Sequence, residues 1–109
     1  MKLAFLGDSI TEGVGASDIE FNYVSQVGKM LGCEVLNYGI GGTRIARKRE
    51  SSLFHRHDID FNLKTKILDK TANKIFVFSG TNDMGHGDAP IGNKSDYNPY
   101  TFHGAVNKL

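Results

Sequence analysis

The stretch KLAFLGDSIT, residues 2–11, is an apolar run that ends abruptly at a serine. Residues 3–6 are apolar without interruption and Gly7 follows them, which is typical of a strand buried on both faces of a sheet. In open parallel sheets, ligands bind just past the carboxyl ends of the strands. Ser9 is therefore a candidate nucleophile. An Asp-Ser pair after a strand is also ordinary turn and helix-capping chemistry, and this second interpretation stays open.

Two more strands are predicted along the chain. Residues 34–38 form a short strand, and residues 74–79 form the clearest apolar strand, which glycine again ends. A helix between the first two strands is predicted to begin at the capping box of Ser17 and Glu20 and to end at Gly32. Its apolar stripe consists of Phe21, Val24, Val27 and Leu31. A strand, a helix and a strand at this spacing form a right-handed parallel unit.

Weaker signals predict two further helices. Residues 60–70 carry a sparse apolar pattern, and Thr101 can cap a terminal helix. The apolar stripe of that last helix consists of Phe102, Ala105, Val106 and Leu109. Gly28 weakens the first helix, and we expect it to serve close packing on the sheet.

Length and composition limit the class of protein. The chain has 109 residues, of which 39% are hydrophobic, so we expect one domain over residues 1–109. Its net charge of +1 does not favour a nucleic-acid partner, and no apolar run approaches the roughly 20 residues that span a bilayer. The apolar start is too short for a leader peptide, so we expect a cytoplasmic protein, with secretion left open. Cys33 is the only cysteine, which excludes an internal disulfide.

Glycine-rich polar turns follow the second and third predicted strands. Residues 39–43 read GIGGT, and residues 80–83 read GTND. Glycine lets the backbone approach a ligand closely and exposes successive amides, which suits an anion or a developing oxyanion. A tight turn without a ligand is the alternative. Three parallel strands thus deliver three polar turns to one edge of one sheet, and this convergence is the main argument for a site there.

The segment after the second turn is charged and irregular. Arg44, Arg47 and residues 48–49 form a basic cluster, which we interpret as a solvated helix face. His55 and His57 with Asp58 could bind a metal, but nothing nearby supplies the remaining ligands, so no metal site is predicted.

The three turns together resemble the first three sequence blocks of the SGNH hydrolases, also called the GDSL esterase/lipase family. The matching residues are GDSIT at 7–11, the run 37–43, and GTND at 80–83, and the run GHGDAP at 85–90 resembles a bacterial esterase branch. The resemblance covers the whole chain. It implies an α/β fold, a three-layer α/β/α sandwich with a flavodoxin-like parallel sheet, in which the first strand lies between the second and the third.

The resemblance also implies roles for individual residues. Ser9 would be the nucleophile, and the backbone amides of Ser9 and Gly42 with the side-chain amide of Asn82 would form the oxyanion hole, which needs fixed donors. Four further residues are assigned to substrate binding, namely Asp8, Thr81, Asp83 and His86. Asp8 and Asp83 are interpreted chiefly as braces of their turns. The chemistry requires no cofactor and no metal.

One element of the family pattern is missing. Family members carry an Asp-x-x-His near the C-terminus whose histidine is the general base, and no such pattern follows Asp83. We therefore expect an N-terminal part of a longer domain, truncated and with little activity of its own. His86 could replace the base only if it reached Ser9 with an orienting partner, and His103 is expected to be structural.

Two functions remain open from the sequence. The first is a serine ester hydrolase that acts through an acyl-enzyme on small acyl or carbohydrate esters. The alternative is a non-catalytic small-ligand binding or assembly module that uses the glycine-rich turns. In either case, the third strand would present an unpaired edge, and we expect self-association through it.

Overall fold

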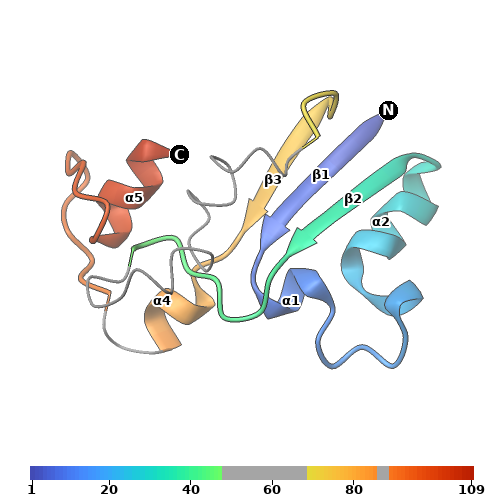
Figure 1. Ribbon diagram of the computed structural model, residues 1–109, viewed down its shortest axis with the longest axis horizontal. Helices are drawn as coiled ribbons and strands as arrows, with labels where there is room; N and C mark the ends of the chain where they lie inside the picture. Colours follow the sequence, from blue (N-terminus) through green and yellow to red (C-terminus); the bar gives the residue numbers. More distant parts are fainter. Residues whose placement is uncertain (48–68, 86–88) are drawn as a thin grey trace.

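The computed structural model describes residues 1–47, 69–85 and 89–109, and these residues contain a parallel sheet of three strands (Figure 1). β1 (Lys2–Gly7) is the central strand, between β2 (Glu34–Gly39) and β3 (Lys74–Phe78). The predicted order of the strands is confirmed. The order of the strands in the sheet differs from their order in the sequence, because β1 pairs with β3 although most of the chain lies between them.

The register of the sheet brings the three carboxyl ends to one edge. Gly7 pairs with Gly39 of β2 and with Phe78 of β3, so all three strands end at the same level. The loops that follow them therefore leave the sheet side by side. This geometry places the predicted polar turns together.

One face of the sheet packs against α2 (Tyr23–Leu31). Leu3 and Phe5 point to this face and form a buried cluster with Val24, since alternate side chains of a strand lie on the same face. The ring of Phe5 stacks on that of Phe76 with centroids 5.0 Å apart. Tyr23 meets Phe5 edge to face, with centroids 5.8 Å apart. Gly28 allows this packing, because a Cβ there would lie 2.9 Å from Val35 Cγ2.

The start of α2 differs from the prediction. Asp18, rather than Ser17, caps a short 3-10 turn, η1 (Ile19–Phe21), and Asn22 then returns to an extended conformation. Asn22 Oδ1 accepts a hydrogen bond from the Ser25 amide at 2.8 Å and begins the real helix. The capping box predicted at Ser17 was therefore wrong, because a better cap lies five residues later.

The predicted apolar stripe of this helix is correct only in its middle. Val24 and Val27 pack on the sheet, but Phe21 and Leu31 are exposed. Gly32 ends the helix with φ +60°, as predicted.

The other face of β1 is covered by an irregular segment. Leu6 packs with Ile45 and Ala46, and Ala105 of α5 (Phe102–Lys108) joins this second cluster. Thr101 Oγ1 caps α5 by accepting from the Gly104 amide at 3.0 Å, which confirms the predicted helix start. β1 is therefore buried from both sides, and the architecture is α/β.

Arg44, the first residue of the basic cluster, does not lie on a solvated helix face, contrary to the prediction. Arg44 is buried, its Nε donates to the Ala46 carbonyl at 2.8 Å, and residues 40–47 are not helical. Charge alone suggested exposure, but the segment runs through the second cluster. Two predictions lie outside the described ranges. They are the interpretation of the histidines at 55 and 57 and nearly all of the helix over 60–70.

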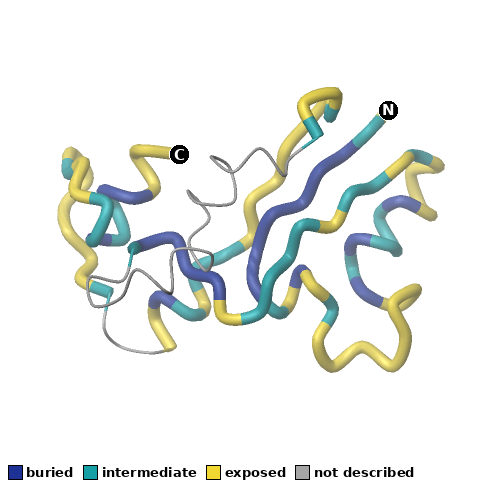
Figure 2. Tube along the Cα trace, viewed as in Figure 1, coloured by how far each residue is buried: buried dark blue, intermediate teal, exposed yellow. Residues whose placement is uncertain are grey.

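Burial differs sharply between the strands (Figure 2). Residues 3–6 of β1 are buried, whereas every residue of β3 is exposed. In the sheet that the described residues form, β3 is an edge strand. Within those residues, no helix has the length and apolar character needed to cross a bilayer.

Candidate active site

Ser9 stands at the first position of a one-turn helix, α1 (Ser9–Glu12), that follows the central strand directly. Asp8 caps this helix, because its Oδ1 accepts a hydrogen bond from the Ile10 amide at 2.9 Å. The interpretation of Asp8 as a brace of the turn is therefore confirmed. Ser9 itself is half-buried, and its Oγ makes no hydrogen bond with the described residues.

Two glycines allow α1 to sit against the ends of the strands. A Cβ on Gly7 would overlap Thr11 Oγ1 and the Phe78 carbonyl oxygen, and one on Gly39 would overlap the Glu12 amide. Only glycine leaves room for this approach. The nucleophile is thus held at the sheet edge by the backbone of two strands.

Glu12 joins this helix to the second turn. Its Oε2 accepts a hydrogen bond from the Gly41 amide at 2.8 Å. A Cβ placed on Gly41 would lie 3.7 Å from Ser9 Cβ, so the second turn passes directly beside the serine. Gly42 follows with φ +81°, a conformation that favours glycine. No described residue accepts a hydrogen bond from the Gly42 amide or from the Ser9 amide.

Asn82 connects the third turn to the second turn. It lies in α4 (Thr81–Gly85), and its Nδ2 donates to the Thr43 carbonyl at 2.9 Å. A side-chain amide carries two N–H donors, so one remains for a ligand. The structure therefore brings Ser9, Gly42 and Asn82 to one edge, through contacts that run from Ser9 to Gly41 and from Thr43 to Asn82.

Asp83 anchors the loop that follows β2. Its Oδ2 accepts from the Ile45 amide at 3.0 Å and its Oδ1 from the Ala46 amide at 2.8 Å, and the residue is buried. A carboxylate bound to two amides is a strong local anchor. These bonds confirm the interpretation of Asp83 as an organiser of the loop. Thr81 is exposed at the start of α4, and His86 lies outside the described residues.

Three buried polar atoms lie in the segments that follow the strands. Asp8 Oδ2, Thr43 Oγ1 and Ser79 Oγ are buried oxygen atoms that have no hydrogen-bond partner in the described part of the chain. They come from the loops after β1, β2 and β3 respectively. Because most buried polar atoms are satisfied, three such atoms behind one sheet edge mark this edge as a place where polar chemistry is concentrated.

Two residues that hold the site together escaped the sequence analysis. Glu12 and Asn37 are the links between α1 and the loop after β2, since Asn37 Nδ2 donates to the Thr11 carbonyl at 2.6 Å and its Oδ1 accepts from the Gly39 amide at 2.9 Å. The bond from Asn37 to the Gly39 amide is local, because a polar residue two positions before a glycine turn can bond that turn. The bonds of Glu12 to Gly41 and of Asn37 to Thr11 join distant residues and have no such signal.

Thr11 is also tied to the main helix. Its hydroxyl shares a hydrogen bond with the Tyr23 hydroxyl at 2.8 Å. Burial is the largest cause that raises the pKa of Tyr23 above its usual 10. The one-turn helix that carries Ser9 is therefore fixed to α2 as well as to the sheet.

Neither a metal cluster nor a histidine beside Ser9 is found among residues 1–47, 69–85 and 89–109. No group of three ligating side chains occurs in these ranges. His103 lies in the first turn of α5, where its amide donates to the Ile91 carbonyl at 2.9 Å and its ring contacts Phe102. This packing agrees with the structural role expected for it.

Comparison with known proteins gives one family match. The model of the GDSL-like lipase/acylhydrolase family matches residues 5–103. No curated protein matches the sequence.

Solved structures resemble the whole chain. One crystal structure superimposes with a TM-score of 0.76 at 31% identity and covers 97% of this chain but 47% of its own. A protein from Lactobacillus plantarum gives a TM-score of 0.73 at 27% identity and covers 99% and 47% respectively. The chain thus spans about half the length of both. With the family match, these similarities fit the predicted flavodoxin-like fold.

Proposed function

The chain belongs to the GDSL-like lipase/acylhydrolase family, and from this premise we propose that it is a serine ester hydrolase that uses Ser9 as its nucleophile. Its substrates would be esters of small acyl groups or of carbohydrates. The observation that carries the proposal is the meeting of Ser9, Gly42 and Asn82 at the carboxyl edge of three parallel strands. Ligands of open parallel sheets bind at this edge.

The proposed reaction follows from the geometry of these groups. Ser9 Oγ attacks the ester carbonyl carbon and loses its proton to a general base, while the electron pair of the C=O bond moves to oxygen. The unpaired amides of Ser9 and Gly42 and the second N–H of Asn82 would stabilise that oxyanion. The bond to the alcohol then breaks, and the alcohol leaves with the proton. Water hydrolyses the resulting acyl-enzyme by the same steps.

The family resemblance assigns the general base to the histidine of an Asp-x-x-His pattern. We therefore propose that full activity needs a longer form of the protein that carries such a pattern, here called the full-length protein, and we compare it with the 109-residue chain. Loss of one member of a catalytic triad removes several orders of magnitude in rate and leaves roughly 10³ to 10⁴ over water. We expect the short form to show little activity.

The test is covalent labelling with a fluorophosphonate, which reacts with activated serines and is read by intact mass. We expect one label in the full-length protein, lost in Ser9→Ala. Ser17→Ala is the matched control, since Ser17 is an exposed serine outside the site. Labelling that survives Ser9→Ala would overturn the proposal.

A second measurement addresses the oxyanion hole. Asn82→Ala removes one proposed donor and is expected to lower kcat for p-nitrophenyl acetate by about 10² to 10³-fold. Asn93→Ala is a suitable control, because Asn93 is exposed. No labelling and no hydrolysis by the full-length protein would favour the alternative, a binding module that uses the glycine-rich turns.

A further inference from the structure

The backbone amides of the loop after β2 are almost all bound within the molecule. Of the five amides from residue 39 to residue 43, four donate to an acceptor among the described residues. In chain order the four acceptors are Asn37 Oδ1, the Gly7 carbonyl, Glu12 Oε2 and the Ile40 carbonyl, at 2.9, 3.0, 2.8 and 3.1 Å. The amide of Gly42 has no acceptor in the described part of the chain, and Gly42 is exposed. This amide is therefore available to a ligand.

The pair Gly41–Gly42 forms the centre of a tight turn. The Thr43 amide donates to the Ile40 carbonyl at 3.1 Å, and of the two central residues only Gly42 has a positive φ, +81°. These are the features of a type II β-turn. The type I alternative differs by a rotation of the peptide between the two central residues, which points the Gly42 N–H to the other side of the turn. The form of this turn therefore decides where the free amide points.

The glycine pair does not fix this form by itself. Glycine has the widest range of backbone conformations, so two glycines in sequence need a contact from outside the turn. Glu12 supplies one, because its Oε2 accepts a hydrogen bond from the Gly41 amide at 2.8 Å. Hydrogen bonds to a carboxylate are among the stronger ones in proteins. This contact ties the turn to α1, the helix that carries Ser9.

The helix α1 is itself held in place beside the turn. Its Thr11 carbonyl accepts a hydrogen bond from Asn37 Nδ2 at 2.6 Å. A Cβ on Gly41 would lie 2.9 Å from Glu12 Oε2 and 3.7 Å from Ser9 Cβ. The turn therefore lies against both the carboxylate and the candidate nucleophile, which come from the same one-turn helix.

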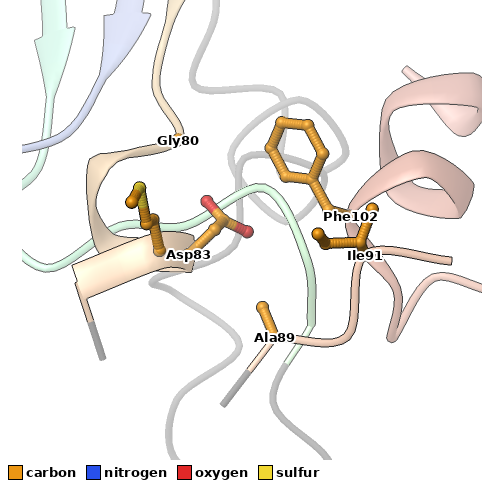
Figure 3. A pocket seen from close by; sticks show the side chains of 6 residues that line it. Gly80, Asp83, Ala89, Ile91 and Phe102 are labelled. Atoms are coloured by element: carbon orange, nitrogen blue, oxygen red, sulfur yellow. The ribbon is translucent and has the colours of Figure 1, made fainter. Parts of the chain in front are cut away.

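A second carboxylate holds the other end of the loop. Asp83 of α4 lies at the wall of a cavity, and Figure 3 shows its carboxylate directed at the segment after β2. There it accepts from the Ile45 and Ala46 amides. Asp83 is 5% exposed, so its removal would leave buried amides unpaired and destabilise the fold. Glu12 is exposed, so its removal leaves the core intact and its effect on the turn can be measured alone.

We propose that Glu12 is a positioning residue of the candidate active site. By binding the Gly41 amide, its carboxylate holds the turn in the form that presents the Gly42 amide to the ester oxygen. This inference rests on the proposed function and adds to it a residue that does not touch the substrate. Glu12 acts here as a hydrogen-bond acceptor, so its oxygen atom is needed and its negative charge is not.

The experiment measures kcat and KM of the full-length protein for p-nitrophenyl acetate. Glu12→Ala removes the acceptor, and Glu12→Gln keeps an acceptor oxygen without the charge. Loss of a whole oxyanion donor costs about 10² to 10³ in kcat, so a displaced donor should cost about tenfold or more. We expect Glu12→Ala to lower kcat by about tenfold or more with KM within about twofold, and Glu12→Gln to stay within about threefold of the wild type. Glu20→Ala is the matched control and should equal the wild type, because Glu20 is an exposed glutamate outside the site.

Two further readouts separate positioning from a loss of folded protein. Fluorophosphonate labelling should still reach one label per chain in Glu12→Ala, at a lower rate, and the urea midpoint should match that of the wild type. A merely structural role would lower the number of labels and the midpoint together and leave kcat per labelled site unchanged, which would overturn the inference.

The outcomes also separate this inference from the proposed function. A wild-type kcat in Glu12→Ala, or a Glu12→Gln variant as slow as Glu12→Ala, would overturn the role of Glu12 while hydrolysis through Ser9 stands. A full-length protein that neither hydrolyses the ester nor takes the label would overturn the proposed function, and this inference with it.

Discussion

β1 and β3 are both apolar strands, and they differ in almost everything else. Residues 3–6 of β1 are at most 5% exposed, whereas residues 75–78 of β3 are between 41% and 56% exposed (Figure 2). β1 has a hydrogen-bonded neighbour on each side and a cluster on each face, but β3 has one described neighbour. Burial in these two strands thus follows their place in the sheet, because both strands are predominantly apolar.

The largest effect is expected from a matched pair of substitutions across the two strands. Phe5 and Phe76 are register partners with stacked rings, but Phe5 is 5% exposed and Phe76 is 44% exposed. Phe5→Ala should lower the free energy of unfolding by about 3–5 kcal/mol, the usual cost for a buried phenylalanine. Phe76→Ala should cost about half of that or less, since its ring is only partly removed from water.

Urea denaturation of both variants, followed by circular dichroism, measures this difference. Similar m-values would show that both variants unfold from comparable native states. Equal losses for the two phenylalanines would contradict the comparison, because they would mean that β3 is as deeply buried in solution as β1.

The exposed edge of β3 gives the next prediction. Unpaired edge strands with apolar side chains add strands from other chains, so we propose that the 109-residue chain self-associates through β3. Val77→Lys should shift sedimentation velocity profiles toward monomer, since a lysine on an edge strand opposes pairing. Val14→Lys is the control, because Val14 is exposed and lies in the turn after α1, outside β3. A wild-type chain that stays monomeric at high concentration would refute the proposal.

The smallest effect concerns the ion pair that ties the start of β1 to the turn before β3. Lys2 Nζ lies 2.9 Å from Asp69 Oδ2. Hydrogen bonds from Thr71, first its hydroxyl and then its amide, and after them Lys2, lower the pKa of Asp69 from 3.8 to about 2. A lowered pKa stabilises the fold above about pH 4, and this contribution is lost as the pH falls through 2.

Asp69→Asn should therefore destabilise the protein slightly at pH 6, and the difference from wild type should shrink below pH 4 and vanish below pH 2. Thermal unfolding over this range of pH measures it. Because the pair is only partly buried, 1 M salt should weaken the part due to Lys2. A difference that stays constant down to pH 2 would assign the effect to packing instead.

The sequence predicted the three strands, because apolar runs ended by glycine are strong local signals, and the family resemblance predicted their order. It misplaced the start of α2, since Ser17 and Asn22 both have capping side chains and only tertiary packing chooses between them. It also misjudged Arg44, whose charge predicted exposure. A buried arginine is visible only when the segment that carries it is placed in space.

The candidate site was likewise predicted only in part. Ser9, Gly42 and Asn82 were proposed from the family resemblance and from their places after the strands. Glu12 and Asn37, which hold the turns in position, act across 29 and 26 residues of sequence, and no local pattern gives such pairs.

The central place of β1 also affects how the chain is made. Its hydrogen bond from Lys2 to Asn73 spans 71 residues. A ribosome adds about 5–20 residues per second, so β1 waits roughly 4–14 seconds for its second neighbour. In the later part of that interval, after β2 has been made, the nascent chain can pair β1 only with β2, and an apolar edge is open to other nascent chains. Chaperone contact should therefore concentrate between the synthesis of β2 and that of β3.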